Sequence, residues 1–129
     1  MEKHAKIISF INMKGGVGKT TLCKEVGLYL SERYQYDNGE SLKVLLIDID
    51  PQSNLTQSLL EKFDKQTTFY DEEGKVDYKC SIDNIFKQDM VGMTEKHVIL
   101  KLSDNLDIIP GELETIFHKD NKIQVHRIN

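Results

Sequence analysis

Apolar residues fall into two short runs near the start of the chain, with a helical pattern between them. Residues 6–12 carry Ile7-Ile8-Ser9-Phe10-Ile11 and end at turn-forming residues, which predicts a strand buried on both faces. Residues 43–50 form a second apolar run and predict another buried strand. Between them the spacing becomes helical and predicts roughly four turns from Thr20 onward, through Leu22, Val26, Tyr29, Leu30 and Tyr34. Two strands joined by a helix predict a right-handed βαβ unit and hence a parallel sheet.

Gly27 interrupts the predicted helix. A glycine inside a helix costs about 1 kcal/mol relative to alanine, so its presence indicates a packing requirement. We therefore expect the helix to approach the sheet closely at this residue.

The stretch from residue 61 to residue 96 is polar and has no clear period. It contains many charges, Gly74 and scattered aromatic residues, so we expect an irregular insertion or long loop. The aromatic residues Phe69, Tyr70 and Tyr78 are expected to pin this loop to the core, with stacking on a base as the alternative.

The end of the chain shows short elements separated by turn residues. Ser81 precedes the apolar residues of 82–86, which predicts a short capped helix. Residues 97–102 and 106–109 predict two strands joined by a turn, and residues 112–118 are expected to begin a helix. The chain thus divides into a βαβ core at 6–60, the insertion at 61–96, and hairpin-like strands with a short helix at 97–129, all within one domain.

Composition narrows the class of protein. The 129-residue chain is long enough to bury a core as one domain. Its formal net charge of −4 argues against nucleic-acid binding through bulk charge, although a local basic face stays open. Cys23 and Cys80 are far apart and have no metal-ligand spacing, which predicts reduced thiols. No apolar run approaches membrane-spanning length, so we expect a cytoplasmic protein that does not act at a membrane.

A glycine-rich turn lies between the first apolar run and the helical pattern. It comprises Lys14, Gly15, Gly16, Val17, Gly18, Lys19, Thr20 and Thr21. Glycines permit consecutive backbone N–H groups to turn toward one anion, and the following helix directs its positive end to the same place. Lys19 adds a charge for the β- and γ-phosphates, and Thr20 is the residue type that ligates Mg²⁺ at this offset. The pattern predicts a binding loop for ATP and Mg²⁺.

This loop departs from the general Walker A pattern at one position. The motif requires glycine five residues before Gly18, where this chain has Met13. In addition, Lys14 precedes the double glycine and is a second lysine that the general motif does not contain.

Two carboxylates follow the second apolar run. Asp48 and Asp50 lie where that predicted strand ends. Ligands of parallel sheets sit beyond the carboxyl ends of the strands, so we expect both aspartates to lie beside the loop. Carboxylates next to a Mg²⁺-triphosphate can hold metal-bound waters and orient an attacking water. Alternatively, one or both acids cap the helix that is expected to begin near Ser53.

Together the two motifs resemble the deviant Walker A ATPases, which include ParA-type partitioning proteins, MinD-type division-site proteins and nitrogenase iron proteins. The second segment is Asp48-Ile49-Asp50-Pro51-Gln52-Ser53-Asn54-Leu55-Thr56. It is similar to the ParA form of the signature, D-x-D-P-Q-x-N. MinD-type proteins usually lack the Pro-Gln pair, and the iron proteins usually differ at the first Asp. The resemblance implies an α/β fold of the P-loop NTPase type, with a mostly parallel sheet flanked by helices.

The resemblance also implies roles and partners. Lys14, Lys19 and Asp50 are the implied catalytic residues, with Lys14 reaching across a dimer interface to the partner subunit's nucleotide. Thr20 and Asp48 are the implied magnesium residues, and Asp50 is the better candidate to orient water. The implied task is plasmid or chromosome partitioning, through a nucleotide-sandwich homodimer and a centromere-binding ParB-like protein.

Part of the expected domain has no counterpart in this sequence. ParA-type proteins continue with an apolar strand ending in Asp, the Walker B carboxylate, whereas residues 123–129 alternate and contain no acid. The chain is expected to correspond to the N-terminal half of the domain, as a fragment or as a natural truncation. We expect an unprotected sheet edge that promotes self-association, and non-specific DNA binding only through the missing half.

Three alternatives to a partitioning ATPase remain. The first is an interaction module that binds nucleotide without turnover. A MinD-like division regulator would need a C-terminal amphipathic helix, and residues 112–129 show no convincing apolar face beside a basic one. A reductase of the iron-protein kind would need cluster cysteines, and neither Cys23 nor Cys80 is suitably placed.

Overall fold

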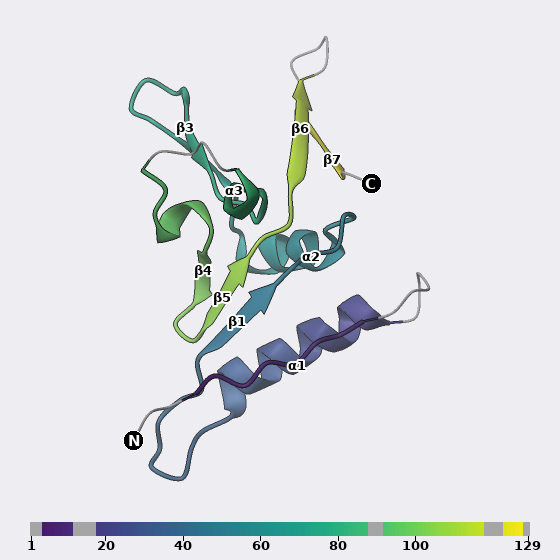
Figure 1. Cartoon of the computed structure of the whole chain (residues 1–129), viewed down its shortest axis with the longest axis vertical. Helices are drawn as coiled ribbons and strands as arrows, with labels where there is room; N and C mark the ends of the chain where they lie inside the picture. Colours follow the sequence, from purple (N-terminus) through teal and green to yellow (C-terminus); the bar gives the residue numbers. More distant parts are fainter. Residues whose placement is uncertain (1–3, 12–17, 88–91, 118–122, 128–129) are drawn as a thin grey trace.

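The computed structural model describes residues 4–11, 18–87, 92–117 and 123–127, with the backbone alone for 114–117 and 123–127 (Figure 1). In chain order the elements are α1 (Lys19–Arg33), β1 (Val44–Ile47), α2 (Asn54–Phe63), β2 (Thr68–Tyr70), β3 (Val76–Lys79), α3 (Asp83–Phe86), the 3₁₀ turn η1 (Glu95–His97), β4 (Leu100–Ser103), β5 (Leu106–Ile109), β6 (Leu113–Phe117) and β7 (Ile123–Arg127).

The central sheet has the strand order β1-β5-β4. β1 runs parallel to β5, from Val44 opposite Leu106 to Ile47 opposite Ile109, whereas β4 is antiparallel to β5. Two separate antiparallel hairpins, β2-β3 and β6-β7, complete the strands. The α/β class is confirmed, and the sheet is mixed because β4 and β5 are joined by a tight turn, which forces an antiparallel pair.

The core lies between the sheet and the two long helices. Buried leucines and isoleucines of α1, α2, β1, β4 and β5 form one cluster, which includes Leu28, Leu46, Leu59, Leu106 and Ile108. Gly27 of α1 faces Leu46, and a Cβ atom built on it would lie 2.9 Å from Cδ2 of that leucine. The prediction that this glycine marks a close approach of helix and sheet is confirmed.

The expected strand over residues 6–12 is absent from the part of the chain that the structure describes. Residues 4–11 carry no regular secondary structure, and the side chains of Ile7 and Ile11 are 91% and 84% exposed. In the view of Figure 1 this segment is drawn across α1. An apolar run indicates that residues favour a buried position, but a strand also needs a neighbouring strand for its backbone hydrogen bonds. No described strand pairs with this segment.

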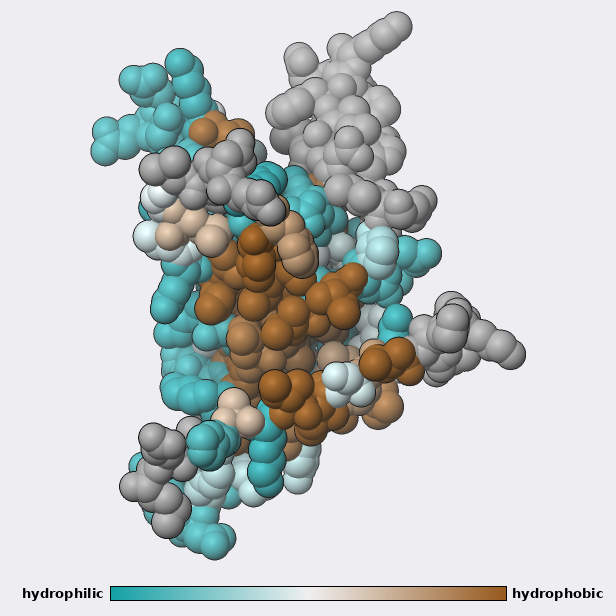
Figure 2. All heavy atoms as spheres, viewed as in Figure 1, coloured by the Kyte–Doolittle hydropathy of each residue, from teal (hydrophilic) through white to brown (hydrophobic). Residues whose placement is uncertain are grey.

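β1 is buried on one face, whereas the sequence predicted burial on both. Leu46 points into the core at 7% exposure, while its neighbours Leu45 and Ile47 are 46% and 53% exposed. Figure 2 shows hydrophobic side chains gathered on the face viewed in Figure 1, over the central sheet. The two long helices cover the other face. Parallel strand pairs are usually covered on both faces, so this open apolar face is a distinctive surface of the chain.

The stretch at 61–96 is more regular than the sequence indicated. It holds the end of α2, the β2-β3 hairpin and α3, because a turn with Gly74 at φ 83° reverses the chain. The Phe69 and Tyr78 rings stack at 4.7 Å, and Phe69 packs on the core cluster. This agrees with the expected pinning role for Phe69 and Tyr78, whereas Tyr70 is 51% exposed.

The last part of the chain differs from prediction in one element. β4 and β5 form the predicted hairpin, although residues 95–97 before it are a 3₁₀ turn. Residues 113–117 form β6, where a helix was expected; that expectation is wrong. β6 pairs in register with β7. Residues 123–127 thus provide a partner strand, and this pairing favours a strand over a helix at 113–117.

Candidate functional site

The first residues of α1 form one half of the candidate site. Gly18 precedes the helix in the left-handed conformation, with φ 84° and ψ 8°. In the part of the chain that the structure describes, no atom beyond its own neighbours and helix lies within 4 Å of the place where its Cβ would be. The 15-residue helix has no acidic residue in its first turn, so its own sequence does not compensate the positive end of the helix. Of the predicted loop, Lys14, Gly15, Gly16 and Val17 lie outside the described residues.

Lys19 and Asp50 bring the two sequence motifs together. Lys19 is the first residue of α1, and its Nζ atom lies 3.3 Å from Oδ2 of Asp50, which follows β1. The other carboxylate oxygen of Asp50 accepts the backbone N–H of Gln52 at 2.9 Å, which fixes the side chain in its turn. Thr20 is half-buried and Thr21 is exposed at the start of the helix.

Asp48 is directed inward. Its side chain is 3% exposed, and its Oδ2 atom accepts both the backbone N–H of Thr56 at 2.9 Å and the hydroxyl of Thr56 at 2.6 Å. Oδ1 accepts the backbone N–H of Asp50 at 3.2 Å. Because Thr56 lies in the first turn of α2, Asp48 satisfies donors at a helix start, as in the capping alternative.

Thr56 and Gly111 contribute to this arrangement, although the sequence analysis did not select them. The backbone N–H of Gly111 donates to Oγ1 of Thr56 at 2.8 Å. A Cβ on Gly111 would overlap the Ser53 hydroxyl, so the turn after β5 packs directly on the segment between β1 and α2. The available signals were Thr56 at the end of the second motif and a Pro-Gly pair directly after a predicted strand.

Both cysteines have raised pKa values. Burial, and to a smaller extent the Asp48 carboxylate, raises the pKa of the Cys23 thiol on α1. Burial raises the pKa of Cys80 to about 11. A raised pKa lowers the thiolate fraction, so neither thiol has the environment of a reactive cysteine.

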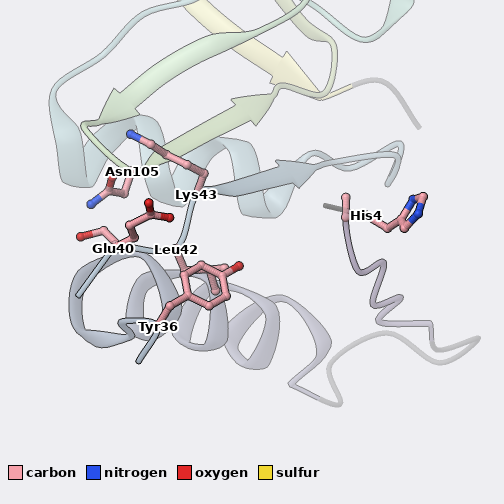
Figure 3. A pocket seen from close by; sticks show the side chains of 8 residues that line it. His4, Tyr36, Glu40, Leu42, Lys43 and Asn105 are labelled. Carbon is pink, nitrogen blue, oxygen red and sulfur yellow. The ribbon is translucent and has the colours of Figure 1, made fainter. Parts of the chain in front are cut away.

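A cavity of about 520 Å³ lies at the opposite end of β1, where Lys43 precedes the strand. Figure 3 shows Tyr36, Glu40, Leu42 and Lys43 of the α1–β1 connection around it, with His4 of the N-terminal segment farther away. Because Asp50 follows the other end of β1, this cavity is separate from the candidate site. Within the described residues, no helix is long and apolar enough to cross a membrane.

Comparison with known proteins identifies the family. A family model described as AAA domain matches residues 5–127. The sporulation initiation inhibitor protein Soj of Bacillus subtilis is 34% identical over 113 residues, which cover 84% of this chain and 35% of that protein. The chromosome-partitioning ATPase Soj of Treponema pallidum is 28% identical, over 95% of this chain and 42% of its own length.

A solved structure supports the same assignment. A plasmid partition protein from Borrelia burgdorferi superimposes with a TM-score of 0.60 at 32% identity, covering 85% of this chain and 40% of that chain. This chain therefore spans less than half the length of these relatives. Since the family model covers nearly the whole sequence and the structural match carries the P-loop NTPase fold, the chain belongs to the AAA domain family and is of the ParA type.

Proposed function

We propose that this chain binds Mg-ATP at the start of α1 and serves in DNA partitioning as an ATPase whose pairing is switched by hydrolysis. The observation that carries this proposal is the position of Lys19, which follows a left-handed glycine, begins a helix and lies 3.3 Å from Asp50. Relatives described as a chromosome-partitioning ATPase and a plasmid partition protein support the biological task.

The described residues fit a bound nucleotide phosphate. Among the described residues no atom crowds the Cβ position of Gly18, which permits a phosphate to approach the backbone, and the first turn of α1 offers N–H groups with no acidic residue of its own. Lys19 has an ammonium group close by, on a side chain that is 32% exposed. These are the features that a triphosphate tail requires: access, donors and positive charge.

Each residue has a proposed task toward the nucleotide. Lys19 would neutralise the β- and γ-phosphates, Thr20 would ligate Mg²⁺, and Asp50 would hold metal-bound and attacking water. Mg²⁺ supplies electrostatic stabilisation when bound, and it commonly keeps several waters and takes few protein ligands. Asp48 was predicted in the magnesium shell; its inward hydrogen bonds favour a role in holding the Asp50 turn.

The proposed partners follow from the family resemblance. Lys14 would reach the nucleotide of a second copy, so that ATP is held between two chains. A centromere-binding ParB-like protein is the further partner, in the cytoplasm. Non-specific DNA, and with it the nucleoid, would be bound only through the half of the domain that has no counterpart in this sequence. Light scattering tests the first point: with ATP and Mg²⁺, Lys14→Ala should abolish dimerisation while nucleotide affinity persists.

A second function is favoured by the N-terminal segment. Residues 4–11, which precede the predicted phosphate loop, are mostly exposed and form no strand. Because no described strand directly precedes the predicted loop, a module that binds nucleotide without turnover is the second candidate, since phosphoryl transfer depends on fixed positioning.

Binding and turnover measured on the same preparation separate these functions. Calorimetric titration with ATP and Mg²⁺ should give binding, and a phosphate-release assay should then give either turnover or none. Turnover that Lys19→Ala abolishes supports the ATPase, whereas binding without turnover supports the module. Absence of nucleotide binding by the folded chain would refute both.

A further inference from the structure

A buried threonine links three segments behind the candidate site. Thr56 is 0% exposed, and its hydroxyl accepts the backbone N–H of Gly111 at 2.8 Å while donating to Oδ2 of Asp48 at 2.6 Å. The three groups form a chain of hydrogen bonds from the turn after β5, through α2, to the end of β1. Such chains strengthen in a buried environment, where no water replaces a lost partner.

Asp48 connects Thr56 to Asp50 through hydrogen bonds to both residues. One carboxylate oxygen of Asp48 is held by Thr56, and the other accepts the backbone N–H of Asp50 at 3.2 Å. The Asp50 carbonyl in turn accepts the backbone N–H of Ser53 at 2.9 Å. The backbone of Asp50 is therefore fixed on both sides, and its side chain points to Lys19.

The packing around the threonine leaves little freedom for another arrangement. Ser53 is 0% exposed and has φ 54°, an uncommon conformation for a residue with a side chain. Its hydroxyl donates to the backbone carbonyl of Glu112 at 3.1 Å. A Cβ on Gly111 would lie 3.4 Å from Oδ2 of Asp48 in addition to overlapping Ser53. Strained backbone persists only where its surroundings determine it, and here those surroundings adjoin Asp50.

We propose that Thr56 is a positioning residue for Asp50: through Asp48 it sets where the Asp50 carboxylate stands beside Lys19 and hence how tightly Mg²⁺ is held with the nucleotide. This inference rests on the proposed nucleotide binding. A helix-capping role alone would not make Thr56 affect metal binding. In the proposed role Thr56 affects how tightly Mg²⁺ is held, whereas nucleotide without metal is bound by Lys19 and the start of α1.

The test measures two quantities on the full chain with a fluorescent ADP analogue: its affinity in EDTA, and the Mg²⁺ concentration that gives half of the metal-dependent increase in affinity. Thr56→Val removes the hydroxyl at nearly constant volume. We expect it to raise the Mg²⁺ midpoint about tenfold, since partners behind a metal site typically contribute 10- to 100-fold. Affinity in EDTA should stay within about twofold of the unsubstituted chain.

Two variants serve as matched controls. Thr56→Ser keeps the hydroxyl and should restore the midpoint to within about twofold. Ser58→Ala, on the same helix, removes the 2.7 Å hydrogen bond from Lys24 without touching Asp48, and should leave the midpoint unchanged. If Thr56→Val does not fold, Gly111→Ala replaces it, because its methyl group presses on Ser53 and Asp48 while every donor and acceptor remains; the midpoint should rise here too.

The outcomes are distinct. An unchanged Mg²⁺ midpoint in the folded variant overturns the positioning role. An equal loss of affinity in EDTA and in Mg²⁺ also overturns it, because general loosening of the fold would act on both. Failure of the unsubstituted chain to bind the analogue at all would refute the proposed nucleotide binding and this inference with it.

Discussion

The ammonium group of Lys19 lies 3.3 Å from Oδ2 of Asp50, and this pair joins residues that are 31 positions apart in the sequence. Both side chains are about one-third exposed, at 32% and 27%, and such partly exposed pairs contribute little to stability. We expect the pair to matter for the proposed nucleotide binding instead. An anion that approaches the start of α1 meets a lysine that already has a carboxylate partner.

Replacement of Lys19 by alanine should weaken ATP binding strongly. The variant loses a charge-assisted interaction worth about 1.5–3 kcal/mol, which corresponds to roughly a 10- to 100-fold higher Kd. Calorimetric titration in the presence of Mg²⁺ measures this change. Lys24→Ala is the matched control, since Lys24 lies on the same helix and donates to Ser58. Equal ATP affinities for Lys19→Ala and the unsubstituted chain would contradict the phosphate-binding role.

Replacement of Asp50 by asparagine should separate metal-free from metal-dependent binding. In EDTA the variant should bind nucleotide as tightly as the unsubstituted chain or several-fold more tightly, because Lys19 no longer has a competing carboxylate. In Mg²⁺ the increase in affinity should shrink, because a carboxylate that holds metal-bound water is lost. A parallel set of titrations with and without Mg²⁺ measures both effects. A large loss of affinity in EDTA would instead place Asp50 in structural support of the loop.

Local sequence patterns predicted those parts of the fold whose partners lie close in the sequence. The spacing from Thr20 onward predicted α1, and the predicted hairpin at 97–109 became β4 and β5. The unusual Gly27 predicted contact with the sheet. Each of these features has a cause within a few residues of the chain: the apolar stripe for α1, the tight turn for the β4–β5 pair and the missing side chain for Gly27.

The remaining features depend on partners that a pattern does not reveal. Residues 6–11 have the composition of a buried strand, but no described strand pairs with them. Residues 113–117 form β6 rather than a helix because they pair with β7. At the site, two aspartates that are only two positions apart point in different directions. Asp50 meets Lys19, whereas Asp48 turns inward to Thr56, whose hydroxyl also contacts Gly111 of a distant segment.

Charged substitutions on the open face of β1 should reduce self-association. Leu45 and Ile47 are 46% and 53% exposed on β1, one edge of which pairs with no described strand, and such an arrangement promotes association between copies. We expect Leu45→Lys combined with Ile47→Lys to lower the mass measured by light scattering at a given concentration, with little change in the melting temperature. Glu25→Lys, an exposed change of charge on α1, is the control for net charge alone. An unchanged mass distribution would show that this face is not where copies meet.

Introduction of a methyl group at Gly27 should destabilise the chain. Alanine gains about 1 kcal/mol of helix propensity, but its Cβ would lie 2.9 Å from Leu46 Cδ2 in a core where overpacking costs about 1–3 kcal/mol. The expected net loss is up to about 2 kcal/mol in urea unfolding. Addition of Leu46→Val should recover part of it, since the smaller side chain gives room. A Gly27→Ala variant that is more stable than the unsubstituted chain would mean that Leu46 moves aside freely.

Cys80 should make the unfolding free energy depend on alkaline pH. Burial raises the pKa of its thiol from the ordinary 9.0 to about 11, and the residue is 1% exposed. As pH rises from about 9 to about 11 the unfolded chain loses this proton while the folded chain keeps it, so the unfolding free energy falls across this window. Urea unfolding at pH 8, 9 and 10 of the unsubstituted chain and of Cys80→Ala measures the effect. The variant should show a smaller decrease with pH, although it is less stable at pH 8 because it leaves a small cavity. Identical decreases in the two proteins would show that the Cys80 thiol ionises as readily in the folded chain as in the unfolded one.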